Sequence, residues 1–447
     1  MTLWMYIAKS WSPTLSNSKP ERSRKRRTRM VVLGDRHFSV LASLIPVASN
    51  LAMTPLLTRT LGTTEFGLWA SLVAVLGSVQ LVDLGVGSSL FRFMAVAQKR
   101  DGRSGCARYV AAAVLYYFVF AALCLLVLLP WHATLYAFIS ARTSSPDQTV
   151  LVFLCLIALT PIGNAFLTAL QAVGDFRQTA SVIFASQLAY AGIVLVTSIA
   201  LHLTIAQVLI AQAIQLFIVI CYAAIRLPIW KIDGWLTRKE IGQFGTFSTR
   251  IWLTNLSGIP VLQLPIIAVT AIASPTAAGV FGLAAMVALA LRNLPLMSVA
   301  PIVRSLTGTK QNIIVQSTQA DKSWRKTLWV YAVLGIVGIV VGVPVLGGPE
   351  YSGAIAPAIL LFSGYIIQLN GAIATITARQ LGLTRVEWQA SAIGGAIHLA
   401  LLWPSISVMG IYGPGTVLII SQSVTLLLVR RQFRSFLRAE VPAIPIS

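Results

Sequence analysis

A single arginine lies in the middle of an apolar stretch of this chain. Arg292 falls within residues 277–303, twelve residues before Arg304, which ends the stretch. In a helix that separation is about 18 Å, which a snorkelling side chain covers only in part. A charge at such a depth costs about 3 kcal/mol on insertion scales unless it faces polar protein or water. Because carboxylates are scarce in the apolar stretches, Arg292 predicts a binding site for an anion.

A structural role for Arg292 is the alternative. Asn293 and Pro295 follow it, and a proline inside a helix removes an N–H donor and frees a backbone carbonyl. The guanidinium of Arg292 would then cap the freed carbonyl instead of binding a ligand. The sequence leaves both interpretations open.

Asp83 is the one carboxylate well inside an apolar stretch, residues 66–90. A carboxylate in that position is typical of a proton- or sodium-coupling site, and it could also pair with Arg292. The alternative is a local structural role beside Gly85 and Gly87. We expect no bound cofactor, with an H⁺ or Na⁺ gradient as the candidate driving force.

Twelve apolar stretches carry these residues. They are 38–58, 66–90, 109–130, 149–170, 179–201, 205–225, 251–272, 277–303, 327–346, 353–377, 388–408 and 411–429. Each is long enough to cross a hydrocarbon core of about 30 Å as a helix. Because backbone groups in lipid must bond internally, the sequence predicts an all-α integral membrane protein with twelve transmembrane helices.

The positive charge is confined to the two tails and to every second gap between the stretches. Of the 34 Lys and Arg residues, 31 lie in the tails or in the gaps 91–108, 171–178, 226–250, 304–326 and 378–387. The opposite gaps hold only Arg59 and Arg142. Since Lys and Arg stay on the cytoplasmic side, both termini are predicted to lie in the cytoplasm.

The net charge of +21 suggests nucleic acid, but basic loops that contact anionic headgroups explain it better, and we expect no nucleic-acid partner. The four cysteines have no spacing that indicates a disulfide or a metal site. Residues 1–37 are either a basic, disordered cytoplasmic tail or, up to residue 29, an extension upstream of a start at Met30.

The two halves of the chain resemble each other. Pro55 and Pro265 each begin a similar segment, Gly67-Leu68-Trp69 matches Gly279-Val280-Phe281, and Arg92 matches Arg304. With six helices per half, the repeat must be parallel, with its pseudo-twofold axis along the membrane normal. The predicted organisation is a tail (1–37), an N-terminal six-helix lobe (38–225), a cytoplasmic linker (226–250), a C-terminal six-helix lobe (251–429) and a basic cytoplasmic tail (430–447).

The segment Thr54–Ala95 resembles the opening of the Wzx-type polysaccharide-transport flippases of the multidrug/oligosaccharidyl-lipid/polysaccharide (MOP) superfamily. The resemblance is carried by the Leu61–Trp69 turn, by Asp83-Leu84-Gly85 with Gly87, and by Arg92. It implies a MATE/MOP-like fold and movement of a polyprenyl-diphosphate-linked oligosaccharide across the inner (plasma) membrane by alternating access. The implied products are surface polysaccharides such as O-antigen or exopolysaccharide, with membrane lipids, a polymerase and glycosyltransferases as partners.

Such a substrate would need cations for its phosphates, preferably the bidentate fork of arginine, and amides for its sugar hydroxyls. Besides Arg292, the candidate cavity residues lie on or beside the proline-containing stretches 38–58 and 251–272: Asn50, Arg59, Arg250, Asn255 and Gln263. The alternatives are interhelical hydrogen bonds for the amides and, for the arginines, membrane anchoring or an exposed ion pair of Arg59 with Glu65.

Two other functions compete with the flippase. An enzyme is disfavoured because the chain has no paired carboxylates, Gly-rich phosphate loop or His/Cys metal spacing. The stronger alternative is a MATE-like multidrug or metabolite antiporter. For cationic drugs we would expect more acid in the cavity than Asp83 provides.

Overall fold

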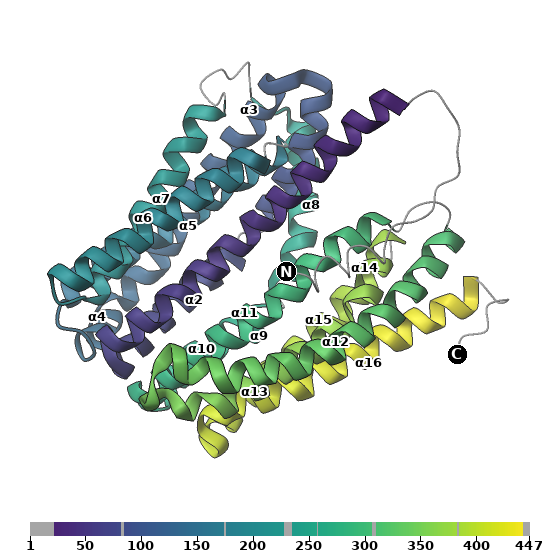
Figure 1. Cartoon of the computed structure of the whole chain (residues 1–447). Helices are drawn as coiled ribbons and strands as arrows, with labels where there is room; N and C mark the ends of the chain where they lie inside the picture. The colour runs from purple at the N-terminus through teal and green to yellow at the C-terminus, as the bar shows by residue number, and fades with distance from the viewer. Residues whose placement is uncertain are drawn as a thin grey trace.

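The computed structural model describes residues 22–81, 85–173, 176–227, 235–256, 258–305, 310–381 and 384–440. Within these ranges every regular element is helical (Figure 1), which confirms the predicted all-α class. Asp83 lies outside the described residues.

The first half of the chain forms one bundle of helices, the N-terminal lobe (Figure 1). Its helices are α2 (Arg22–Leu81), α3 (Val86–Leu128), η1 (Leu129–Trp131), α4 (His132–Ser140), α5 (Pro146–Ala172), α6 (Phe176–Ala200) and α7 (Ile205–Arg226). The second half forms the C-terminal lobe. After α8 (Arg238–Leu256) it contains α9 (Ile259–Leu262), α10 (Leu264–Ile272), α11 (Pro275–Ser305), α12 (Lys310–Gly347), η2 (Pro349–Ala354), α13 (Ile355–Asn370), α14 (Ala372–Gln380), α15 (Thr384–Met409), η3 (Gly410–Tyr412) and α16 (Gly413–Glu440).

Nine segments of the described chain are long and apolar enough to span a membrane. Two of them join predicted stretches: Leu44–Gln80 covers parts of two, and Glu387–Phe433 contains two. In the first, the chain turns at Gly62, whose φ of 69° suits a residue without a side chain. The predicted stretch 251–272 is instead broken into α8, α9 and α10 around Gly258, Pro260 and Pro265, since proline interrupts the helical hydrogen-bond ladder.

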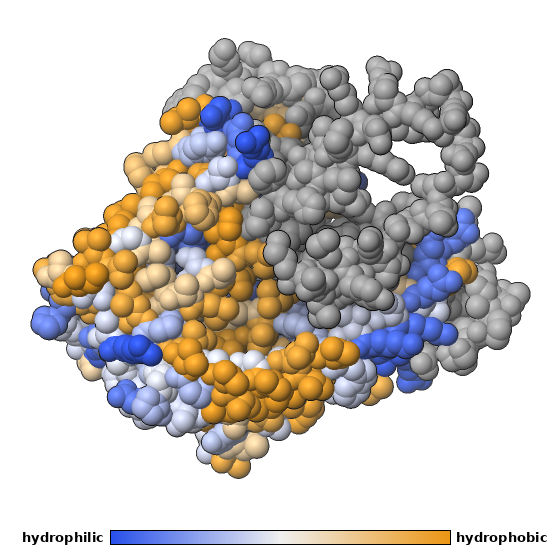
Figure 2. Space-filling model, viewed as in Figure 1, coloured by the Kyte–Doolittle hydropathy of each residue, from blue (hydrophilic) through white to orange (hydrophobic). Residues whose placement is uncertain are grey.

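Apolar side chains cover much of the visible outer surface of the helices, as expected for a multi-pass membrane protein (Figure 2). On α12, Trp329 is 73% exposed and Val333 is 61% exposed. Large apolar residues are this exposed in water only at some cost, whereas lipid solvates them. We call the end of the bundle at which α7 ends and α12 begins the basic end, and the other end the opposite end.

The two lobes meet near the opposite end along a line of small residues. A Cβ atom added to Gly67 of α2 would lie 2.6 Å from the backbone nitrogen of Gly279, and one added to Gly279 of α11 would lie 1.9 Å from the carbonyl oxygen of Thr63. These glycines are the repeat equivalents identified in the sequence, so the equivalent positions of the two halves pack against each other. Only glycine permits so close an approach of two backbones.

The line continues toward the basic end. The hydroxyl groups of Ser71 and Thr270 lie 2.5 Å apart across the lobes. A Cβ added to Gly77 would lie 2.5 Å from the side-chain nitrogen of Gln263. We call the contacts of Gly67, Ser71 and Gly77 with α10, α11 and Gln263 the small-residue seam. They span ten residues of α2, so the seam closes the lobes together over about 15 Å of helix.

Part of the predicted linker 226–250 is helical, because it includes most of α8. Although α8 leads into the C-terminal lobe, it packs on α3 of the N-terminal lobe: Ser248 donates a hydrogen bond to Ser89 (2.7 Å), and the guanidinium of Arg92 lies 4.4 Å from the ring centre of Phe247. The rings of Phe93 and Phe244 also pack in a tilted arrangement, with their centres 5.6 Å apart. The break after α8 therefore separates a segment held by one lobe from α10, which belongs to the other.

We expect the seam to be sensitive to a single methyl group. In a chain freed of its native cysteines, Ser71→Cys and Thr270→Cys should form a disulfide on oxidation. Adding Gly279→Ala should reduce cross-linking by at least about tenfold, because its Cβ has no room against Thr63. Gly338→Ala, at a site with open space on α12, is the control. Undiminished cross-linking in Gly279→Ala would contradict the closed seam.

Candidate functional site

Arg292 lies within the C-terminal lobe, between α11 and α13. Its Nε donates a hydrogen bond to the side-chain oxygen of Gln368 on α13 (2.8 Å), and its Nη1 donates to the side-chain oxygen of Asn293 (3.3 Å). The guanidinium carbon is 5.4 Å from the centre of the Tyr365 ring. The side chain is neither fully buried nor exposed. The cation is therefore held by two neutral amides and an aromatic face.

Several donors of this guanidinium stay available. Arginine carries five N–H groups, and two of them are used by Gln368 and Asn293. Among the described residues, no acceptor contacts the remaining three and no carboxylate pairs with Arg292. Such a group can form a bidentate interaction with a phosphate or carboxylate oxygen pair.

The carbonyl freed by Pro295 is satisfied by a different residue. Because Pro295 has no N–H, the carbonyl four residues earlier, that of Leu291, loses its helical partner. The hydroxyl of Tyr331 on α12 donates a hydrogen bond to this carbonyl (2.5 Å). Arg292 does not bond to it, so the structural alternative for Arg292 does not describe this helix.

The register of α11 turns Asn293 toward the other lobe. Gly279 and Gly282 contact α2, and Asn293 follows Gly279 by fourteen residues, close to four turns of 3.6 residues. Arg292 lies one position earlier, about 100° around the helix and away from that face, and its Nη1 reaches Asn293. Along the helix Arg292 is about 20 Å beyond Gly279, which is farther toward the basic end than the extent of the seam on α2.

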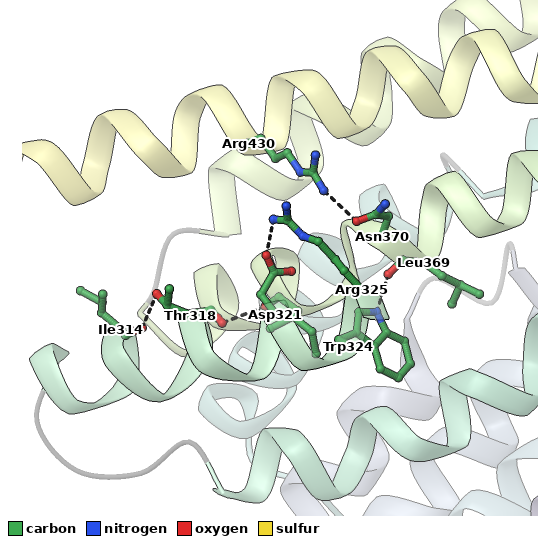
Figure 3. A network of polar contacts seen from close by, with 10 residues as sticks. Ile314, Thr318, Asp321, Trp324, Arg325, Leu369, Asn370 and Arg430 are labelled. Carbon is green, nitrogen blue, oxygen red and sulfur yellow. Dashed lines mark hydrogen bonds and ion pairs between the residues drawn. The ribbon is translucent and has the colours of Figure 1, made fainter. Parts of the chain in front are cut away.

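The end of α13 is fixed by neighbouring helices directly after Gln368 (Figure 3). Trp324 of α12 donates its indole N–H to the carbonyl of Leu369 (2.8 Å), and Arg430 of α16 donates to the side chain of Asn370 (2.7 Å). On α12, Arg325 pairs with Asp321. Gly371 then separates α13 from α14. Two helices thus hold the last turn of α13.

Of the other predicted site residues, the three with described side chains, Gln263, Asn50 and Arg59, do not bond to Arg292. Gln263 packs against Gly77 in the seam. Asn50 and Arg59 are exposed on α2, and Asn50 accepts a hydrogen bond from Thr54 through its backbone carbonyl. Arg250 and Asn255 lie on α8, and their side chains are outside the described residues, as is Asp83.

Three residues of the site were missed in the sequence: Gln368, Tyr365 and Tyr331. Glutamine and tyrosine within apolar helices are common enough that none of them is distinctive. The available signal was a polar residue on another helix at a depth comparable to that of Arg292. Gln368 in the stretch 353–377 meets that condition.

Comparisons with known proteins agree with this architecture. The family model described as "Polysaccharide biosynthesis protein" matches residues 38–306. A search of curated proteins finds no match. Among solved structures, an inward-facing multidrug resistance MATE family transporter of the MOP superfamily has a TM-score of 0.69 at 11% identity, covering 90% of this chain and 96% of that one.

Two further solved structures are similar. An outward-facing multidrug resistance MATE family transporter of the MOP superfamily has a TM-score of 0.59 at 11% identity, covering 90% of this chain and 94% of that one. A MOP superfamily transporter from Pyrococcus furiosus, described as having a binding pocket of reverse polarity, has a TM-score of 0.59 at 12% identity and the same coverage. These matches show the fold, and they confirm the predicted MATE/MOP-like architecture of twelve helices in two lobes.

Removing the Tyr331 hydroxyl should leave the Leu291 carbonyl without a partner. We expect Tyr331→Phe to destabilise the protein by about 1–3 kcal/mol, the cost of an unsatisfied buried polar group. The measurement is thermal unfolding in detergent. Tyr412→Phe, at an exposed position, is the matched control and should change little. Equal unfolding temperatures for Tyr331→Phe and the wild type would refute the role assigned to this hydrogen bond.

Proposed function

The chain belongs to the polysaccharide biosynthesis protein family and has the MOP transporter fold, and from this premise we propose that it is a flippase for lipid-linked oligosaccharides. The family match over residues 38–306 confirms the resemblance found at Thr54–Ala95. Family and fold are those of transporters and not of enzymes. The proposed substrate is a polyprenyl-diphosphate-linked oligosaccharide, used for surface polysaccharides such as O-antigen or exopolysaccharide.

One observation supports this substrate above others. Arg292 is a cation inside the C-terminal lobe with neutral partners and three uncommitted N–H groups among the described residues. A cationic drug would be repelled by such a group, whereas a diphosphate would accept its hydrogen bonds. A drug or metabolite antiporter therefore fits this interior less well, although it would share the fold.

Alternating access gives the seam a role in this proposal. The seam joins the lobes near the opposite end, and Arg292 lies beyond it toward the basic end. In the proposed cycle the diphosphate reaches Arg292 from the cytoplasm while its lipid tail stays in the bilayer. The seam then opens to release the sugar outside.

The proposed location is the inner (plasma) membrane with both termini in the cytoplasm. Single cysteines at Ser144 and Ser352 should react with an impermeant thiol reagent from outside the cell. Cysteines at Thr246 and Lys322 should react only after the membrane is opened, because the basic gaps stay inside. All four positions are exposed, so access from solvent is not limited by burial. Labelling of Ser144→Cys only from the inside would reverse the topology.

Arg292→Ala should abolish flipping of the lipid-linked oligosaccharide at normal membrane abundance. Arg292→Lys should restore it only in part, because an ammonium keeps the charge and loses the planar fork. The measurement is the appearance of the oligosaccharide at the outer face of vesicles that contain the purified protein. Arg431→Ala, an exposed arginine of α16, is the control. Transport by Arg292→Ala equal to that of the wild type would overturn the proposed role of Arg292. Export of cationic drugs without oligosaccharide transport would favour the antiporter.

A further inference from the structure

Arg292 is oriented by oxygen atoms that carry no net charge. Its Nε donates to Gln368 and its Nη1 donates to Asn293. An amide oxygen accepts a hydrogen bond as a carboxylate oxygen does, but it leaves the positive charge of the guanidinium uncompensated. In apolar surroundings an arginine is more often paired with a carboxylate or with backbone carbonyls. Because its partners are neutral, Arg292 keeps its full positive charge for attracting an anion.

The bond to Gln368 also selects which edge of the guanidinium faces the ligand. A guanidinium has two edges that can bind an oxygen pair, one formed by Nε with an Nη and one formed by the two Nη atoms. With Nε bonded to Gln368 at 2.8 Å and one N–H of Nη1 bonded to Asn293, the second N–H of Nη1 and both N–H groups of Nη2 are left for a ligand. The ring of Tyr365, 5.4 Å from the guanidinium carbon, limits rotation of the plane.

Gln368 itself has little freedom to move along the helix axis. The next two residues, Leu369 and Asn370, are bonded to Trp324 of α12 and Arg430 of α16 (Figure 3). This bracket of Trp324, Leu369, Asn370 and Arg430 fixes the last turn of α13. Short contacts thus connect α12 and α16, through the last turn of α13, to Arg292.

We propose that Gln368 is the positioning and charge-setting residue of the anion site: it aims the Nη edge of Arg292 at a diphosphate without neutralising the guanidinium. The inference rests on the proposed function, since it assigns the selectivity of the same site. Whether residue 368 carries an amide or a carboxylate would then decide whether the site accepts an anion.

The decisive change replaces an amide with a carboxylate of nearly the same shape. Gln368→Glu keeps the acceptor at 2.8 Å from Nε and forms an ion pair with Arg292. We expect diphosphate affinity to fall by at least about tenfold, because the ligand now competes with a carboxylate for the same charge. The thermal stability of the protein should stay equal or rise. If Gln368 had only a packing role, the change would lower the thermal stability and leave the diphosphate affinity unchanged.

The experiment measures binding to the purified full chain in detergent, with inorganic diphosphate and farnesyl diphosphate as probes. Four proteins are compared: wild type, Arg292→Ala, Gln368→Glu and the double variant. Because both changes act on one interaction, the double variant should bind no more weakly than Arg292→Ala alone. Gln212→Glu, a carboxylate added at a half-buried position of α7, controls for the added charge. Binding of inorganic diphosphate as tightly as farnesyl diphosphate would show that the headgroup alone is recognised, as proposed.

The outcomes separate this inference from the proposed function. If the wild type binds neither probe, the anion site itself is absent and both proposals fail. If Arg292→Ala loses binding while Gln368→Glu binds like the wild type, the anion site stands and the role of Gln368 is refuted. Should Gln368→Glu not fold, Gln368→Met tests the orientation alone, with an expected affinity near that of Arg292→Lys. Wild-type affinity in Gln368→Met would equally overturn the inference.

Discussion

The cost of leaving a polar group unpaired in an apolar medium governs this structure. Water is absent from the bilayer core, so every backbone group must bond within the protein. That requirement makes the chain helical, and it explains why Tyr331 donates to the carbonyl that Pro295 leaves free. Arg292 departs from this rule, because only two of its five donors have acceptors among the described residues. In the proposed function the other three bind the anionic ligand.

Close backbone contact between the two lobes is the second constraint. Lipid provides little hydrophobic drive for helix association, so packing of small residues supplies much of it. The seam relies on Gly67, Gly279 and the Ser71–Thr270 hydroxyl pair. The seam is not the whole contact between the lobes: Phe66 also packs edge-on against Tyr351, with ring centres 5.8 Å apart, and both belong to a buried apolar cluster that includes residues of both lobes. In the proposed cycle these contacts would form and break together with the seam.

The sequence predicted the helices and the two lobes, because both depend on local composition or on charge placement. It also drew attention to Arg292 as the arginine within an apolar stretch, and the role of Arg292 stays a prediction. Hydropathy did not show that the predicted stretch 251–272 is broken into α8, α9 and α10. Nor could the sequence predict that α8 packs on α3 through Phe244, Phe247 and Ser248. Hydropathy averages over a window, so a broken helix and a continuous one look alike. Gln368 was missed because the pairing of α11 with α13 is a tertiary contact, and one glutamine in an apolar helix has no distinctive pattern.

The positive charge of Arg292 has no counterpart at the equivalent position of the other repeat. At the offset that relates Gly67 to Gly279, the equivalent of Arg292 is Gln80, a neutral and exposed residue of α2. The partners of Arg292 on α11 and α13 lie in the C-terminal lobe, whereas the seam contacts join the two lobes. A rocking motion would therefore break the seam and leave the hydrogen bonds of Arg292 intact. A diphosphate bound to that lobe would travel with it, while the other lobe changes which side of the membrane it is exposed to.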